Sequence, residues 1–300
     1  VAYSKPRSPA AANAAFLEPF APGSCIKIVT LLGYLRHAPA GLFPLACPGR
    51  ATIAGKVFYD WAAHGQVRDF TQALAVSCNF SFARMGQAIG LAPLADLLRR
   101  CYFNGPPFTD WFLKFPAGSF NDRAGDDFRL ASLAVGREEV RVTTLHASVL
   151  AAIFSQGGQF FPPYLIDDAK NILGLGFYRH AARPVRALAD DLNFLRVSKA
   201  MAAVVENESG TGHKARCESV RLAIKTGTAG SSRQGLDAVV IGFFPADEPR
   251  YAFAFRLQGA GKADAKPGPG PRPPASGRLH SWTRSSPGPV RRTVRHPRSA

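Results

Sequence analysis

Three short motifs, separated by long intervals, constrain this 300-residue chain more than any other feature of its sequence. They are Ser24–Lys27 (SCIK), Ser77–Asn79 (SCN) and Lys225–Thr228 (KTGT). Any one of them alone is a weak signal, since patterns this short occur by chance in many chains. Together they supply a serine nucleophile, lysines that can carry protons and a strand edge that can hold a carboxylate. A fold that uses them must bring all three to one place.

Ser24 and Lys27 have the spacing of a nucleophile and its base. A serine hydroxyl reacts poorly unless a base takes its proton, and a lysine can do so only where burial or another cation lowers its pKa. The nearly all-apolar run from Ser24 to Leu32 predicts a buried helix that begins at Ser24, after a turn at Pro22 and Gly23. Residues three apart share a helix face. An N-cap serine is the alternative for Ser24, but Lys27 then lacks a reason for its costly burial.

The third motif follows an apolar run, residues 220–224, which predicts that KTGT lies at the end of a strand. There Gly227 would let a substrate lie against the backbone. Residues 236–245 and 251–257 read as two further strands with a turn between them, so we expect an antiparallel meander. Plain structural alternatives exist for each motif: a strand end for KTGT, and for SCN a capped turn before a helix at Phe80–Ile89.

Taken together, these motifs resemble those of the penicillin-binding protein transpeptidases, a family within the superfamily of the serine β-lactamases. Other family landmarks occur in the family's order: residues 58–61 with 64–65, 72–76, Gly136 with 142–143, 156–158 and 210–212. The resemblance covers roughly residues 1–259. It implies an α/β fold of the α+β type, in which an antiparallel sheet carries the Lys225 strand, packs on the Ser24 helix and is flanked by helices. An inserted helical subdomain would supply Ser77. Residues 1–6 look like the tail of a family strand, so we expect an incomplete sheet.

The resemblance also implies a role for each motif residue. Ser24 would be the acylated nucleophile, Lys27 its general base and Ser77 the group that relays a proton to the leaving group. Asn79 would hydrogen-bond the amide of the acyl donor, and Lys225 would support the charges around Ser77 and the substrate carboxylate. The remaining assignments concern binding: Thr226, Gly227 and Thr228 would bind substrate, and the backbone amides of Ser24 and Thr228 would form the oxyanion hole.

The function implied by the resemblance is a D,D-transpeptidase that cross-links peptidoglycan through an acyl-serine and binds β-lactams covalently. We expect peptidoglycan stem peptides and β-lactams as ligands, cell-wall synthesis proteins as partners, and neither a metal nor an organic cofactor. Family members are tethered in the bacterial envelope, outside the plasma membrane. No apolar run here reaches the ~18 residues of a membrane span, so we expect the anchor to lie outside this chain. A class D type β-lactamase, which usually has an aliphatic residue in place of Asn79, a β-lactam sensor and an inactive fragment remain alternatives.

Composition separates the two ends of the chain. Residues 260–300 are rich in Gly, Pro, Ser and Arg and nearly devoid of aliphatic residues, so we expect a disordered tail after a catalytic domain at 1–259. This tail carries half of the net charge of +16. The sequence contains no recognisable nucleic-acid-binding module and no basic stripe with interleaved aromatics, so nucleic acid is not an expected partner. We expect the basic chain to meet an anionic cell wall instead.

The five cysteines are odd in number and scattered, without a Cys-x-x-Cys pair, so they predict neither a disulfide framework nor a metal site. Cys25 and Cys78 are expected to point away from the cleft as small buried residues. A disulfide between Cys47 and Cys78 stays open for an oxidising compartment. Other residues with catalytic side chains are expected to have structural or solvated roles: His64, His146, His213, Asp126–Asp127 and Glu138–Glu139.

Overall fold

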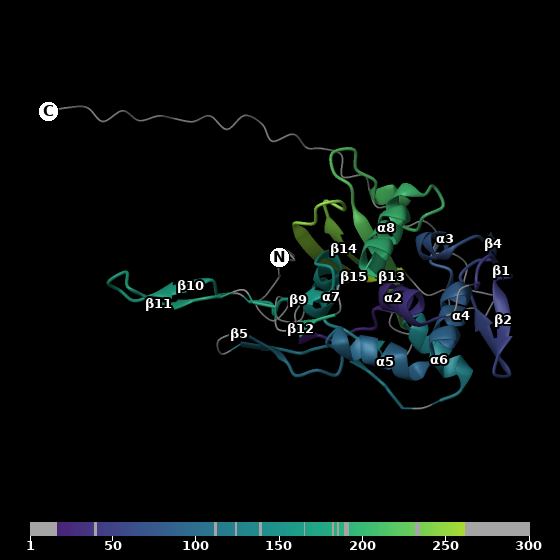
Figure 1. The fold of residues 1–300 in the computed structure, drawn as a ribbon, viewed down its shortest axis with the longest axis horizontal. Coiled ribbons are helices and arrows are strands. Elements are labelled where there is room, and N and C mark those ends of the chain that lie inside the picture. The colour runs from purple at the N-terminus through teal and green to yellow at the C-terminus, as the bar shows by residue number, and fades with distance from the viewer. Residues whose placement is uncertain are drawn as a thin grey trace.

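The computed structural model describes residues 17–38, 41–110, 113–123, 125–137, 140–164, 166–181, 183–184, 186–188, 192–231 and 235–261. The predictions for residues 1–6, for Glu138–Glu139 and for nearly all of the 260–300 tail fall outside these ranges and stay predictions. Helices and small antiparallel sheets surround a central helix, α2, in Figure 1. The predicted α+β class is confirmed.

The main sheet is the predicted antiparallel meander. Its strands are β13 (Ala223–Ser231), β14 (Gly235–Phe244) and β15 (Tyr251–Gly261), in the order β13-β14-β15. The KTGT motif lies inside β13, where Lys225 pairs with Ile241 and Gly227 with Val239. The prediction that the motif ends its strand is therefore wrong, because pairing with β14 continues to Ser231. Helix α8 (Leu192–Glu206) packs on β13, and helix α7 (Thr144–Ser155) packs on β14 and β15.

The predicted nucleophile helix begins as a tighter turn than expected. Residues Gly23–Ile26 form the 3-10 helix η1, and α2 continues directly from Lys27 to His37. Pro22 occupies the position before η1, so Ser24 is not an N-cap residue. The two helices run on without a break and place Ser24 about one turn before Lys27, as the spacing predicted.

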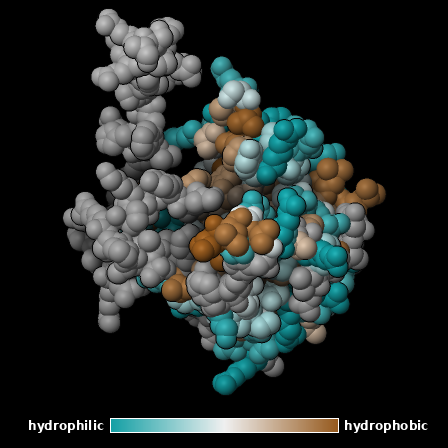
Figure 2. All heavy atoms as spheres, turned by 90° about the vertical axis from the view of Figure 1, so that its left-hand side faces the viewer, coloured by the Kyte–Doolittle hydropathy of each residue, from teal (hydrophilic) through white to brown (hydrophobic). Residues whose placement is uncertain are grey.

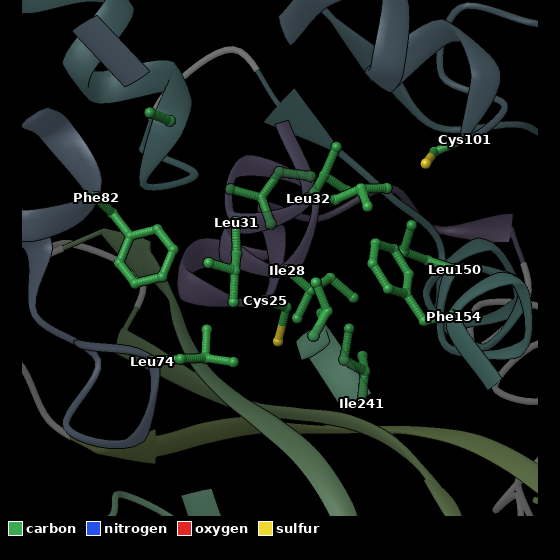
Figure 3. Close-up of a cluster of buried hydrophobic side chains, with 14 of the residues drawn as sticks. Cys25, Ile28, Leu31, Leu32, Leu74, Phe82, Cys101, Leu150, Phe154 and Ile241 are labelled. Atoms are coloured by element: carbon green, nitrogen blue, oxygen red, sulfur yellow. The ribbon is translucent and has the colours of Figure 1, made fainter. Parts of the chain in front are cut away.

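Helix α2 runs through the hydrophobic core, as Figure 3 shows. Ile28, Leu31 and Leu32 are fully buried, and residues from the sheet and from the neighbouring helices surround them. The side chains labelled around them are Cys25, Leu74, Phe82, Cys101, Leu150, Phe154 and Ile241. Burying one such aliphatic side chain contributes about 1.5–3 kcal/mol. The core thus fixes the junction of η1 and α2, which carries Ser24 and Lys27.

The helical subdomain consists of α3 (Phe70–Ala75), α4 (Asn79–Ile89), α5 (Leu91–Arg100) and α6 (Asp127–Ala134). It lies between the two catalytic segments of the sequence, as predicted, and the SCN motif forms the link from α3 to α4. Cys78 caps α4, since its Sγ accepts from the backbone N–H of Ser81. Asp126 caps α6 by accepting from the N–H of Arg129 and pairs with Lys56 at 2.8 Å. This acid therefore has a structural role.

Short antiparallel pairs of strands lie around this core. They are β1 (Leu45–Cys47) with β4 (Gly65–Val67), β2 (Arg50–Ile53) with β3 (Lys56–Tyr59), β5 (Phe108–Asp110) with β6 (Leu113–Phe115), β7 (Ser119–Phe120) with β8 (Val140–Arg141), β9 (Gln159–Phe160) with β12 (Arg186–Ala187), and β10 (Asp168–Lys170) with β11 (Gly176–Arg179). The β10–β11 hairpin projects from the body at the left of Figure 1. At its tip Ile172, Leu173 and Leu175 are exposed. Figure 2 views the molecule from that side and shows hydrophobic patches scattered among hydrophilic residues.

Candidate active site

The three sequence motifs meet at the Ser77 hydroxyl. Lys27, the first residue of α2, donates from Nζ to Ser77 Oγ at 3.2 Å. Lys225, in β13, donates from Nζ to the same oxygen at 2.9 Å. Elements that are 50 and 148 residues from Ser77 in sequence thus converge on one atom. This juxtaposition is what the motif set predicted.

The backbone of Ser77 is held in an unusual conformation. Its φ is +55°, in the left-handed region that non-glycine residues seldom adopt and that costs on the order of 1 kcal/mol or more. Backbone bonds over the end of α3 hold the turn, with Ser77 N donating to Leu74 O and Cys78 N to Ala73 O. Ser77 itself is buried. Strain that the surroundings overcome in this way is typical of functional sites.

Lys27 is fully hydrogen-bonded within the site. Besides Ser77 Oγ, its Nζ donates to Ser77 O at 2.8 Å and to Asn79 Oδ1 at 2.7 Å. An ammonium has three protons to donate, so a neutral Lys27 amine would release one of these contacts and gain a lone pair. The hydroxyl of Ser24, which is half-buried, has no hydrogen bond to the described residues. The predicted Ser24–Lys27 pair is thus joined through the backbone, where Lys27 N–H donates to Ser24 O, but the two side chains are not hydrogen-bonded.

The two lysines differ in how readily they lose a proton. Both side chains are fully buried. Burial, reinforced by the positive charge of Lys225, holds the pKa of Lys27 well below its ordinary value. Burial also lowers the pKa of Lys225, but only to about 8. Near neutral pH the site can therefore contain a neutral Lys27 amine beside a charged Lys225 ammonium.

Glycines allow close backbone contact between β13 and the turn at Pro22 and Gly23 that precedes Ser24, here called the nucleophile turn. A Cβ on Gly227 would lie 2.5 Å from Pro22 O, and one on Gly23, whose φ is +52°, would lie 2.3 Å from Thr228 O. A third contact comes from Gly136 (φ +75°), where a Cβ would lie 2.0 Å from Gly23 O. The space beside Gly227 is thus filled by the nucleophile turn, a role that the sequence did not predict. Its predicted role in substrate binding stays a prediction.

The threonines of KTGT lie on the edge strand of the sheet. Thr226 donates from Oγ1 to Thr211 Oγ1 at 2.7 Å, and Thr228 is exposed. The backbone N–H of Thr211 donates to Ala75 O, just before the SCN motif. Thr211 therefore links β13 to the Ser77 turn. In the sequence, residues 210–212 were noted only as a family landmark. Their Gly-Thr-Gly pattern was the signal that could have indicated a role for Thr211.

Asp60 is a buried carboxylate beneath the SCN motif that the sequence did not single out. Its Oδ2 accepts from the N–H of Phe80 at 2.9 Å and from the thiol of Cys78 at 3.2 Å. Its negative charge opposes the lowering of the Lys27 pKa. His64 lies beside it, with Nδ1 at 3.6 Å from Oδ2. His64 thus has a buried structural partner, in keeping with the expectation for this residue.

The described cysteines are free thiols, so the disulfide left open between Cys47 and Cys78 is not formed in this structure. Cys25 is buried, and its thiol donates to the backbone carbonyl of Lys225 at 3.5 Å. Burial raises its pKa to about 12, which makes it a poor nucleophile. The two other histidines singled out in the sequence contact backbone carbonyls, His146 that of Cys101 and His213 that of Val205.

Comparisons with known proteins concern the family and the fold of the chain. The sequence profile described as "Penicillin binding protein transpeptidase domain" matches residues 2–270. The chain is 24% identical over 280 residues to the peptidoglycan D,D-transpeptidase MrdA of Acinetobacter baumannii, a match that covers 81% of this chain and 40% of that protein. The chain therefore spans less than half the length of this relative.

Solved structures share the fold. The D,D-transpeptidase domain of a peptidoglycan glycosyltransferase from Eggerthella lenta has a TM-score of 0.75 at 24% identity, over 85% of this chain and 64% of that one. Penicillin-binding protein A of Mycobacterium tuberculosis, solved as a penicillin G acyl-enzyme complex, has a TM-score of 0.75 at 21% identity, over 86% of this chain and 60% of that one.

Proposed function

Because the chain belongs to the penicillin-binding protein transpeptidase family, we propose that it is a serine D,D-transpeptidase that cross-links peptidoglycan and is acylated by β-lactams. One observation carries the proposal: Ser77 Oγ accepts from both Lys27 and Lys225. Lys27 itself follows Ser24 by about one helical turn. We infer that Ser24 is the nucleophile, Lys27 the base and Ser77 the proton relay of one site.

Acylation follows from the protonation states of the two lysines. The neutral Lys27 amine takes the proton of Ser24, and Ser24 Oγ attacks the carbonyl carbon of the penultimate D-Ala of a stem peptide. The C–N bond to the last D-Ala breaks. Ser77 gives its proton to the leaving amine and recovers one from Lys27, so the ammonium of Lys27 returns to the amine. General acid–base transfer of this kind is worth roughly 10²- to 10⁴-fold in rate.

The other motif residues are proposed to bind the acyl donor. Asn79 Oδ1 already holds Lys27 and its amide nitrogen remains to donate to the substrate. Thr226 and Thr228, on the edge strand, would bind the terminal carboxylate together with the charge of Lys225. The backbone N–H groups of Ser24 and Thr228 would form the oxyanion hole, each donor being worth about 3 kcal/mol of barrier. An amine of a neighbouring stem then attacks the acyl-serine and restores Ser24.

Covalent labelling with benzylpenicillin tests the proposal. We expect intact mass spectrometry to show one added ligand mass, and peptide mapping to locate it at Ser24. Ser24→Ala should abolish labelling, whereas the control Ser148→Ala, on α7, should label like the parent chain. Labelling that survives in Ser24→Ala, or that maps to Cys25 or Ser77, would contradict the assignment.

A β-lactamase is the second candidate, and the fate of the acyl-serine distinguishes it. Hydrolysis needs a base that activates water beside the ester. Glu206, one of the described acids, is instead paired with Arg221 at 2.6 Å on the surface. The polar Ser77 and Asn79 also disfavour the dry lysine site that a class D enzyme requires. We expect an acyl-enzyme that persists for many minutes and no multiple turnover of nitrocefin. Turnover that bicarbonate enhances would move the assignment to a β-lactamase.

The setting of the reaction follows from the proposed substrate. Peptidoglycan stems occur outside the plasma membrane, so we place the domain on the periplasmic face of the envelope, beside other cell-wall synthesis proteins. Within the described residues, the helices are too short or too polar to span a membrane.

An inactive fragment is the third candidate function. A folded chain, shown by a cooperative melting transition, that forms no benzylpenicillin adduct would support it.

A further inference from the structure

Strand β15 forms one edge of the main sheet. Among the described residues it pairs with β14 alone, and its backbone bonds to no other strand. An edge strand directs about half of its N–H and C=O groups away from its neighbour, and a further strand can pair with them. This edge is long, since β15 runs for eleven residues.

One face of β15 carries a row of large apolar side chains. Tyr251, Phe253, Phe255 and Leu257 alternate along the strand and therefore share a face. Tyr251, Phe255 and Leu257 are 62%, 58% and 62% exposed. The rings of Phe253 and Phe255 lie 5.2 Å apart, so the row is continuous. A contiguous exposed apolar patch is typical of a surface that binds a partner.

The opposite face of β15 is already covered. Ala254 is buried there, and helix α7 packs on the strand (Figure 1). On the same face Arg256 pairs with Asp237 at 2.8 Å and with Glu18 at 3.3 Å. A partner can therefore reach β15 along its edge and over the apolar row.

A second copy of this chain fits that edge better than the rest of the same chain does. Residues 1–16 contain Pro6 and Pro9, which cannot donate to a ladder of strand hydrogen bonds. Residues 262–300 are rich in Gly and Pro, which strands disfavour. A second copy instead brings an identical strand with the same free edge and the same apolar row. Two-fold symmetry lets both strands use the same surface.

We propose that two copies of the chain associate by antiparallel pairing of their β15 strands. A two-fold axis at Ala254 places Phe253 opposite the partner's Phe255, and Tyr251 opposite the partner's Leu257. Each apolar side chain of the row then faces another. Pairs of aromatic and aliphatic side chains directly opposite each other stabilise antiparallel strands.

The charges of β15 are compatible with this register. Arg256, the charged residue within the strand, lies opposite the partner's Ala252. The two arginines therefore do not face each other, and each keeps its acidic partners in its own copy. Like charges directly opposite would have destabilised the pair.

This association leaves the candidate active site open. Strand β13, which carries KTGT, is the other edge of the three-stranded sheet, so a paired sheet has one β13 at each end. One strand pair buries less than the ~800 Å² per partner of a standard interface, so we expect a dimer that dissociates on dilution. The inference concerns association and does not depend on the proposed transpeptidase reaction.

Sedimentation equilibrium of the 300-residue chain tests the proposal. It is run over a wide range of micromolar concentrations, in salt that screens the repulsion between chains of net charge +16. We expect the mass to rise from that of one chain to that of two. Hydrogen exchange in residues 251–257 should slow over the same range, because the outer N–H groups of β15 become bonded.

Charged variants make the test specific. Phe255→Lys and Leu257→Lys each place a charge in the apolar row and should weaken association by roughly tenfold or more. Ile172→Lys is the matched control, since it charges a fully exposed aliphatic residue at the tip of the β10–β11 hairpin. It should associate like the parent chain. Melting transitions show which variants are folded, and either β15 variant suffices.

Cross-linking tests the register. Tyr251→Cys and Leu257→Cys, each made together with Cys217→Ser, are mixed and oxidised by oxygen with a copper catalyst. Two thiols lose their hydrogens to oxygen and form one disulfide. We expect it to join position 251 of one chain to position 257 of the other, in the mixture and not in either variant alone. Paired strands hold opposite Cα atoms at about 4.5–5.5 Å, within the reach of a disulfide.

Three results would overturn the proposal. The first is a parent chain that stays monomeric at its highest concentration, as it would if its own residues 1–16 occupied the edge. The second is association that Ile172→Lys abolishes and both β15 variants retain, which would place the contact at the hairpin. The third is a dimer whose two cysteine variants do not cross-link, which would exclude the pairing about Ala254.

Discussion

Lys27 and Lys225 donate to the same oxygen, Ser77 Oγ, one from helix α2 and one from strand β13. Two ammonium groups this close disfavour each other's charge, and both are fully buried. Their shared hydroxyl, that of Ser77, connects them. The two lysines can therefore have different protonation states, with Lys27 neutral and Lys225 charged.

Replacing Lys27 tests its role as the base. Lys27→Met keeps most of the buried volume but removes the amine, so the benzylpenicillin acylation rate should fall by roughly 10²- to 10⁴-fold. Stopped-flow or quenched labelling measures this rate. Lys199→Met, on the exposed face of α8, is the control and should acylate at the parent rate. A fall of less than tenfold in Lys27→Met would exclude Lys27 as the base.

The pH dependence of acylation should report both lysines. The rate should rise with pH as Lys27 loses its proton, at a pH well below the ordinary lysine pKa. It should fall again above about pH 8, where Lys225 loses the charge that supports Ser77 and the substrate carboxylate. Lys225→Arg, whose guanidinium stays charged, should acylate more slowly but lack the alkaline fall. An unchanged alkaline limb in this variant would contradict the assignment.

Gly227→Ala should disturb the contact between β13 and the nucleophile turn. The added methyl would lie 2.5 Å from Pro22 O, a backbone atom that cannot move aside alone. Overpacking of this kind costs about 1–3 kcal/mol of unfolding free energy, which chemical denaturation measures, and should also slow acylation. Gly176→Ala in β11, where a Cβ meets nothing within 4 Å, is the matched control. Equal stability and equal acylation in the two variants would contradict this view of Gly227.

His146 should make the domain sensitive to acid. It is fully buried among aromatic rings, and burial lowers its pKa from 6.5 to about 4. Between these two pH values the unfolded chain binds the proton and the folded chain does not, so stability falls as the pH falls through this range. The loss is up to about 3 kcal/mol.

Denaturant midpoints at pH 7 and pH 5 measure this effect. The drop should be smaller in His146→Asn than in the parent chain, whereas His213→Asn, at a partly exposed histidine, should behave like the parent. An equal drop in His146→Asn would show that other groups cause the acid sensitivity.

The sequence predicted the features that depend on local pattern and on the motif set. The meander β13-β14-β15 followed from alternation, and the meeting of Lys27, Ser77 and Lys225 followed from the motif set. What could not be predicted depends on contacts between distant segments. The fit of Gly227 against Pro22 is visible only when both backbones are placed.

The contacts of Asp60 beneath Ser77 were missed for the same reason. Asp60 and Cys78 are 18 residues apart in sequence, and that spacing does not indicate a contact between them. Asp60 belongs to the landmark at residues 58–61, but no chemical role was predicted for it. The tight start of the nucleophile helix at Gly23 was also misjudged, because the register of a first turn depends on the glycine contacts with β13.

The glycine contacts between the nucleophile turn and β13 have a consequence for how such a domain can change under selection by antibiotics. Because backbone atoms of Pro22 and Thr228 and the thiol of Cys25 lie directly against these glycines, a side chain added at either glycine cannot change the separation of the turn from the edge strand by small steps. Gradual loss of β-lactam affinity would then have to come from the rim, at exposed positions such as Thr228. Resistance that leaves the proposed cell-wall reaction intact should therefore accumulate around the site and spare the glycines within it.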